Sequence, residues 1–197
     1  TNRSKQTRRI EITSYAEVVI APPSADAMHP AFSNLFVETE ILPQRRAILC
    51  TRRPRSQAET APWMVHLMKV RGPLAADVSY ETDRSLFLGR GGSTSAPLAL
   101  TSRTPMSGTS GSVLDPIVSI RSVISLEPGQ SATVDIVTGM AESRDLAIGL
   151  AERYQDRHLA DRAFELAWTH SQVVRRQLNA SEDDAQLYAR LAGSVIH

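Results

Sequence analysis

The residues best suited to bind a ligand gather in one short segment, residues 80–92. Arg84 and Arg90 flank a glycine-rich stretch, and Phe87 lies between them. A guanidinium group offers planar, forked donors that match sugar hydroxyls or phosphate oxygens, and an aromatic ring can stack on a pyranose face. From chemistry alone, two plainer alternatives stay open. The arginines can be solvated surface residues, and Phe87 can anchor the loop to the core.

Carboxylates are the other group from which glycosyl chemistry could be built. Such chemistry needs an acid that donates a proton, together with a second carboxylate or a phosphate nucleophile. Nothing in the sequence marks any carboxylate as buried or paired, so we expect solvated residues on strand faces and assign no catalytic residue. The five considered are Glu38, Glu40, Glu81, Asp83 and Asp115.

Other familiar motifs are incomplete. Residues 89–92 are glycine-rich but lack the Lys-Ser/Thr of a phosphate loop, and residues 108–111 do not form a nucleophile elbow. The five histidines are dispersed, so we expect no metal site. Cys50, the single cysteine, lies in an apolar run, which favours a buried structural thiol and a reducing compartment. We therefore expect no cofactor.

Composition narrows the class of partner. The chain has 197 residues, 42% of them hydrophobic and 22% charged, which is typical of a globular protein. A net charge of +1 gives no general attraction to nucleic acid. The sequence contains neither a signal peptide nor an apolar run of the ~20 residues that a membrane span needs. We expect no nucleic-acid partner and no direct membrane contact by this segment.

Hydrophobic periodicity divides the chain into a β part, residues 1–140, and an α part, residues 141–197. Apolar residues alternate through residues 10–20, as in a half-buried strand. They also alternate through residues 117–126, where Val118, Ile120, Ile124 and Leu126 share one face. Short strands separated by turn residues favour an antiparallel β-sandwich over a parallel sheet, which makes the fold β-rich α+β. The further strands expected are residues 35–42 and 47–52 as a hairpin, then 63–70, 78–82 and 117–126, with a turn at 127–130 leading into a returning strand.

The α part shows three patterns of helical spacing. Each has a single apolar stripe, so each helix needs a surface to pack against. Ser181 followed by Asp184 is typical of a helix N-terminus, since the hydroxyl can accept a hydrogen bond from an unpaired backbone N–H. Before these helices, residues 87–111 form a long segment rich in Gly, Ser, Thr and Pro, and such loops are usually functional or disordered.

Four ordered blocks of sequence carry a family resemblance that spans nearly the whole chain. The strongest includes Pro22, Pro23, Asp26, His29, Pro30 and Asn34. The blocks are residues 13–40, residues 80–84 with 87–91, residues 107–116 with 126–129, and residues 162–172 with 185–187. Together they resemble the phosphorylase-like region of the cyclic β-1,2-glucan synthases, which are relatives of the cellobiose and chitobiose phosphorylases in glycoside hydrolase family 94.

The resemblance implies a galactose-mutarotase-like super-sandwich, incomplete at its N-terminus, followed by linker helices that lead toward an (α/α)6 barrel. In that family the barrel holds the general-acid aspartate, and inorganic phosphate attacks the anomeric carbon with inversion. The implied parent is a glycosyltransferase or glycoside phosphorylase. The chain itself is expected to be a non-catalytic and inactive fragment, because the resemblance places no catalytic acid on any of its residues.

The resemblance also implies partners. In family dimers a sandwich loop can reach the sugar site of the neighbouring subunit, and residues 84–103 match that loop. Arg84, Phe87, Arg90 and Arg103 thus become candidate substrate-binding residues, Arg103 by its position alone. The implied partners are a β-glucan oligosaccharide, inorganic phosphate as co-substrate, the barrel and a second subunit. The implied location is the cytoplasmic side of an inner-membrane parent.

Two other functions remain open. A stand-alone carbohydrate-binding module would need a platform of exposed aromatic residues, yet aromatics make up only 5% of the chain and the two tryptophans are Trp63 and Trp168. A pure dimerisation or scaffold element would need no ligand contact, so that replacing Arg84 or Arg90 would leave the activity of the parent unchanged.

Overall fold

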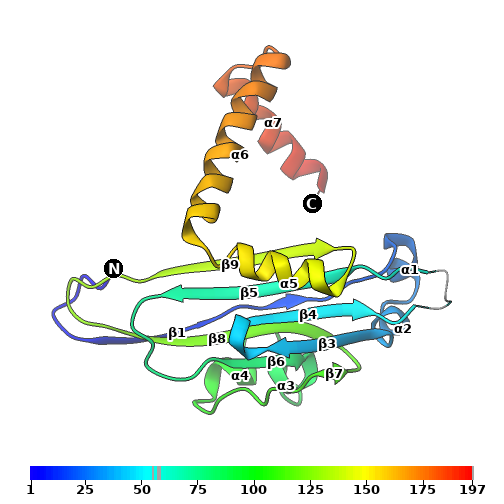
Figure 1. Ribbon diagram of the computed structural model, residues 1–197, viewed down its shortest axis with the longest axis vertical. Helices are drawn as coiled ribbons and strands as arrows, with labels where there is room; N and C mark the ends of the chain where they lie inside the picture. The colour runs from blue at the N-terminus through cyan, green and yellow to red at the C-terminus, as the bar shows by residue number, and fades with distance from the viewer. Residues whose placement is uncertain (55, 57–58, 197) are drawn as a thin grey trace. The chain divides into compact units, whose positions relative to one another are not determined.

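The chain forms two compact units, residues 1–153 and residues 154–197. The computed structural model (Figure 1) describes residues 1–54, 56 and 59–196. The first unit contains two antiparallel sheets that face each other, which confirms the predicted β-sandwich. The second unit consists of two helices and their connection.

The first sheet is built around one long strand, β8 (Pro116–Leu126). Its neighbours all run antiparallel to it, and two of them come from the beginning of the chain. The predicted strand at residues 10–20 is interrupted at Ser14 and Tyr15, so it forms two strands and not one. The neighbours of β8 are β1 (Arg8–Thr13), β2 (Ala16–Glu17) and β6 (Ser79–Asp83).

The second sheet has the strand order β7-β3-β4-β5-β9. The predicted hairpin is confirmed: β3 (Val37–Leu42) and β4 (Ala47–Arg52) are joined by a 3-10 turn, η1 (Pro43–Arg45), and Arg46 follows in the left-handed region at φ 48°. The remaining strands are β5 (Trp63–Arg71), β7 (Gly111–Ser112) and β9 (Thr133–Ala141).

The predicted turn at residues 127–130 exists, but it leads from one sheet to the other. Gln130 N–H donates to the Glu127 carbonyl at 3.0 Å, and Gly129 adopts φ 79°. The strand that follows, β9, pairs with β5 and not with the strand before the turn. Alternation shows which face of a strand is buried, but it does not show which neighbour the strand pairs with.

The core lies between the two sheets, and the face of β8 that alternation predicted helps to fill it. Val118, Ile120, Ile124 and Leu126 of β8 are all buried there. The opposing sheet contributes Val37, Ile48, Cys50, Met64, Met68 and Val70.

Helix α5 (Arg144–Arg153) covers the outer face of the second sheet, over β4, β5 and β9 (Figure 1). Ala147 and Ala151, one helical turn apart, are fully buried. Leu49 and Leu67 on the outer face of the sheet are equally buried. The helix therefore belongs to the compact sheet unit, although the sequence pattern placed the boundary after residue 140.

The segment expected to be long and irregular contains two short helices, α3 (Arg84–Leu88) and α4 (Leu98–Thr101). They lie beside β6, on the side of the sandwich away from α5 (Figure 1). The loop of the strongest sequence block is also partly helical. It contains α1 (Pro23–Met28) and α2 (Pro30–Asn34), each beginning with a proline, whose fixed φ suits a first helical position.

The second unit holds α6 (Arg157–Gln177) and α7 (Glu182–Ile196). Asp156 caps the first helix by accepting from His158 N–H at 3.0 Å. The predicted N-terminus at Ser181 is confirmed, because its hydroxyl accepts from Asp184 N–H at 3.1 Å and the Asp184 carboxylate accepts from Ser181 N–H at 2.9 Å. Both helices expose apolar and aromatic side chains, including Phe164, Trp168 and Tyr188.

Candidate functional site

Phe87 fixes the candidate loop to the sandwich. Asp83 caps α3 by accepting from Ser85 N–H at 2.8 Å, which sets the direction of the helix. The Phe87 side chain is 3% exposed and packs against Tyr15 with ring centroids 4.9 Å apart. Of the two roles open for Phe87 in the sequence, the structure therefore shows the anchoring one. A ring buried in this way has no face available for a pyranose.

Arg84 is held by the protein itself. Its Nε donates to Glu17 Oε1 at 3.0 Å and to the Tyr15 hydroxyl at 3.2 Å, and its Nη1 lies 3.4 Å from Asp115 Oδ2. Hydrogen bonding to Tyr15 and the two nearby carboxylates raise the pKa of Arg84 above its ordinary value. These partners join the start of the loop to β2 and to the residue before β8.

Arg90 and Arg103 differ from Arg84 because both are exposed. Neither has an ion-pair or hydrogen-bond partner among the described residues. The loop thus presents two free guanidinium groups on a base that Phe87 and Arg84 hold in place.

Beneath the loop, the outer face of β6 and β8 carries two buried charges, Glu81 and Arg121, which are 2% and 3% exposed. Glu81 Oε1 accepts from the backbone N–H of Thr82 at 3.0 Å and of Asp83 at 3.1 Å, and its other oxygen accepts from the Ser107 hydroxyl. The sequence interpretation of Glu81 as a solvated residue is wrong, because the loop covers this face of its strand.

Arg121 clamps the far end of the same loop. It donates to the carbonyls of Ala99 and Thr104, the latter at 3.1 Å, and to the Thr13 hydroxyl at 3.3 Å. A guanidinium group with several acceptors in fixed positions restrains a loop effectively, since its donors are planar and rigid. Sequence reasoning missed this residue. The signal was a single charged residue, at an outward-facing position, in the middle of a strand that otherwise contains apolar residues and serines.

A cavity of about 180 Å³ lies between this charged floor and the loop. Glu81, Arg121 and Ser107 line its polar side, and Phe87, Leu98 and Met106 are among the apolar residues. All polar groups named here are already hydrogen-bonded to the protein, so the arrangement fixes the loop and leaves its outer surface for contact.

The other four carboxylates are also engaged. Glu40 accepts two hydrogen bonds from Arg144 at 2.5 and 2.8 Å, which lower the pKa of Glu40 and tie α5 to β3. Glu38 lies 3.3 Å from Arg53 Nε, and the roles of Asp83 and Asp115 were given above. These four carboxylates are partly exposed and bonded within the protein, and no two of the five form an acid pair.

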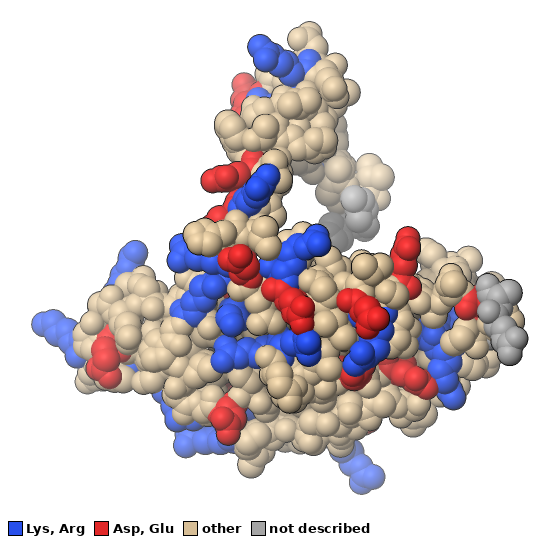
Figure 2. Space-filling model, viewed as in Figure 1, with Lys and Arg blue, Asp and Glu red and all other residues tan. Residues whose placement is uncertain are grey.

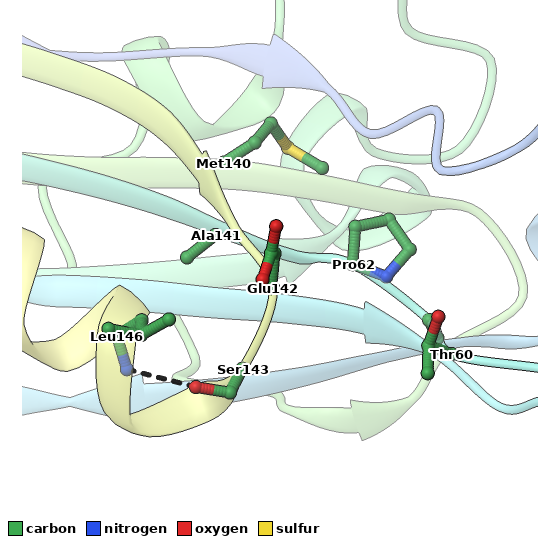
Figure 3. Close-up of a pocket in the computed structure, with 8 residues that line it drawn as sticks. Thr60, Pro62, Met140, Ala141, Glu142, Ser143 and Leu146 are labelled. Carbon is green, nitrogen blue, oxygen red and sulfur yellow. Dashed lines mark hydrogen bonds between the residues drawn. The ribbon is translucent and has the colours of Figure 1, made fainter.

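A second hollow, of about 620 Å³, lies where β9 ends and α5 begins. Figure 3 shows the turn that carries Met140, Glu142 and Ser143 on one side, and Pro62 and Thr60 from the segment before β5 on the other. Ser143 starts the helix by accepting from Leu146 N–H at 3.3 Å. An adjoining cavity of about 360 Å³ shares Ala61, Pro62 and Met140 with this hollow, and Arg52 lies in its wall.

Two buried groups with shifted pKa values lie in the sandwich interior. Burial raises the pKa of Cys50 to about 12, in keeping with a structural thiol. Burial lowers the pKa of His66 to about 4. The imidazole of His66 contacts the hydroxyls of Thr138 at 2.8 Å and Ser14 at 2.9 Å, and thereby links the two sheets as a neutral group.

The described residues form neither a surface patch of one charge on the face shown nor a cluster of metal ligands. Basic and acidic side chains are interspersed on the face shown in Figure 2. Within the described residues, which exclude His197, no three metal-ligating side chains come together. Among the helices that the structure describes, none combines the length and apolarity of a membrane span.

Comparison with known proteins agrees with this architecture. The model of the glycosyl hydrolase 94 supersandwich domain matches residues 1–157. The cyclic beta-(1,2)-glucan synthase NdvB of Rhizobium meliloti (strain 1021) is 33% identical over 196 residues, which cover 100% of this chain and 7% of that protein. The chain thus spans a small part of the length of this curated relative. The chain belongs to the glycosyl hydrolase 94 supersandwich family.

Proposed function

We propose that this chain is the non-catalytic sandwich and linker-helix part of a carbohydrate-active enzyme that acts on β-glucan. The reaction would be glycosyl transfer or inverting phosphorolysis, with the acid and the phosphate site on a further helical domain. The family assignment supports the carbohydrate class. Exposed apolar side chains on both helices of the second unit, such as Phe164 and Trp168, favour a helical domain as their neighbour.

The observation that carries the proposal is the loop between residues 84 and 103. Buried Phe87 and Arg121 fix its two halves, and Arg90 and Arg103 remain exposed and unpaired within the described part of the chain. A loop that is already held in place loses little backbone entropy on binding, and the forked donors of its arginines suit sugar hydroxyls or phosphate. We propose that this loop reaches the sugar site of a neighbouring subunit in a homodimer.

The test compares the chain with the longer enzyme that contains the helical domain. The chain alone should release no glucose 1-phosphate from β-1,2-glucan in phosphate buffer. In the longer enzyme, Arg90→Ala and Arg103→Ala should each lower kcat/KM by about tenfold, the effect of one charge-assisted hydrogen bond. Arg9→Ala, at an exposed arginine on β1, is the matched control.

Release of glucose 1-phosphate by the chain alone would refute the non-catalytic assignment. Unchanged kinetics in both loop variants would instead favour a pure scaffold or dimerisation role. A stand-alone carbohydrate-binding module finds little support in the first unit, because the exposed large hydrophobic side chains of its described residues include one aromatic residue, Phe32.

A further inference from the structure

A third cavity lies between the two sheets at the β3–β4 hairpin turn, and it shares no residue with the loop between residues 84 and 103. Its volume is about 640 Å³, within the range of small-ligand pockets. The hairpin turn of the second sheet contributes Pro43 and Arg46. The connection from β5 to β6 and the start of β6 form the opposite side, which includes Leu74, Asp77 and Tyr80.

Backbone hydrogen bonds fix both sides of this cavity. Arg46 N–H donates to the Pro43 carbonyl at 3.1 Å, and the Arg46 carbonyl accepts from Met68 N–H at 3.2 Å. On the opposite side, Ala75 N–H donates to the Val123 carbonyl of β8 at 2.8 Å. The walls are therefore held in place by the fold, without a ligand.

Tyr80 brings a hydroxyl group without a protein partner to this cavity. The residue is 7% exposed, and its ring belongs to the core between the sheets. Its hydroxyl has no hydrogen-bond partner among the described residues, yet it is not one of their fully covered unpaired atoms, so it keeps surface open to solvent. The hydroxyl of a buried tyrosine usually finds a hydrogen-bond partner, and here a ligand can supply one.

Arg46 and Asp77 add one charge of each sign. Within the described part of the chain, neither side chain has an ion-pair or hydrogen-bond partner. Burial raises the pKa of Tyr80, and the positive charge of Arg46 opposes that rise, which shows that the guanidinium group lies near the phenol. The Tyr80 hydroxyl is therefore protonated at neutral pH and can donate or accept a hydrogen bond.

The backbone of Arg46 indicates that its side chain has a role beyond the fold. Arg46 adopts φ 48°, in the left-handed region, where the Cβ of an ordinary residue approaches the backbone unfavourably. Glycine or asparagine fits such a position at lower cost. Strained residues of this kind concentrate at functional sites, and no partner among the described residues accounts for an arginine here.

We propose that this cavity binds one neutral pyranose ring of a β-glucan through its hydroxyl groups. Arg46 and Tyr80 can donate to sugar oxygens, and the Asp77 carboxylate can accept from a sugar hydroxyl. Pro43 and Leu74 offer apolar surface to the C–H face of the ring. That the sugar is a β-glucan rests on the proposed function, whereas the need for a ligand with both donors and acceptors rests on the three unpaired groups.

The charges favour a neutral ligand over an anion. Among the described residues that line the cavity, those charged at neutral pH are Arg46 and Asp77. Phosphate or a carboxylate would be attracted by the first and repelled by the second. A sugar hydroxyl avoids this conflict, because it accepts one hydrogen bond and donates another.

The experiment measures binding of a β-1,2-linked glucose disaccharide to the 197-residue chain by NMR of side-chain methyl groups. Val78 lines the proposed site, and Met106 lines the cavity under the loop and serves as an internal control. The Val78 signals should shift saturably while Met106 stays unchanged. Tyr80→Phe removes only the unpaired hydroxyl, so it should weaken binding about fivefold and leave the urea midpoint unchanged. Tyr188→Phe, at an exposed tyrosine of α7, should bind normally.

Arg46→Asn separates binding from folding. Asparagine tolerates the left-handed conformation better than arginine, so the urea midpoint should stay the same or rise. The affinity should fall about tenfold, because a charged donor is lost. Asp77→Ala should weaken binding to a similar extent. Arg53→Asn, at the other end of β4, is the matched control and should bind normally.

No saturable shift at Val78, unchanged affinity in Tyr80→Phe and Arg46→Asn, or an equal shift with inorganic phosphate would overturn the proposal. A lower urea midpoint for Arg46→Asn would show that Arg46 serves the fold, and would also overturn it. These outcomes do not depend on catalysis. They can therefore be separated from a failure of the loop variants in the longer enzyme.

Discussion

Two buried arginines on opposite sheets of the sandwich have very different surroundings. Arg121, on the outer face of β8, donates to two carbonyls and a hydroxyl. Arg52, on the inner face of β4, has an aromatic ring, a carboxylate at 4.0 Å and, within the described part of the chain, an Nε without a hydrogen-bond partner. The first residue completes the fold of a loop, whereas the second leaves a donor open. Burial of a charged side chain therefore does not by itself indicate function. The two arginines differ in the number of hydrogen-bond acceptors that surround each guanidinium group.

The largest effect should come from Arg121→Leu. This change removes the guanidinium group, which donates to the carbonyl of the buried Ala99 and to that of Thr104. We expect the free energy of unfolding to fall by about 3 to 5 kcal/mol, the cost of losing two hydrogen bonds from a charged donor. Urea denaturation measures the loss. A loss of less than about 1 kcal/mol would show that the loop does not depend on this clamp.

Acid should produce the next largest effect through His66. Its pKa is about 4 in the fold and near 6.5 in the unfolded chain, so below pH 6.5 the unfolded state binds a proton that the folded state does not. The contribution of His66 to the free energy of unfolding is therefore fully present above pH 6.5. It should fall by about 3 kcal/mol as the pH is lowered to about 4. His66→Gln should lack this component. Urea denaturation gives the free energy of unfolding against pH for the unmodified chain and for His66→Gln. The difference between the two profiles separates the contribution of His66 from that of the carboxylates.

The smallest effect should come from Arg52→Leu, the same substitution at the incompletely bonded arginine. It removes a weak cation–π contact and a long ion pair, but it also removes an unpaired buried donor. We expect the free energy of unfolding to change by less than about 1 kcal/mol. If the loss equals that of Arg121→Leu, Arg52 is a structural residue, and the contrast between the two arginines fails.

Local patterns predicted the elements well. Alternation placed the buried faces of β8, and proline, glycine and capping residues placed the β3–β4 hairpin and the start of α7. These features depend on residues close together in sequence. Strand pairing was harder to predict from the sequence, because the turn after Leu126 is compatible with a following strand in either sheet. Tertiary packing selects β5 as the partner of β9.

The candidate sites were predicted in part. Arg90 and Arg103 are exposed as a ligand-binding role requires, and the segment that carries them was identified from its arginines and glycines. Glu81, Arg121 and Arg52 were not recognised as buried. Each of them is covered by a segment that is at least several residues away in the sequence, such as residues 99–107, which cover β8. Local hydrophobic periodicity cannot predict which segment will cover a strand face.

The central position of β8 has a consequence for the order in which the chain can fold during synthesis. Arg8 pairs with Leu126, so the first strand has no partner until the ribosome has made residue 126. At ordinary translation rates this delay is on the order of ten seconds. Meanwhile the β3–β4–β5 meander can form from neighbouring segments. Strand β1, which lacks a sheet partner during this time, is therefore the strand of this domain most dependent on protection by chaperones.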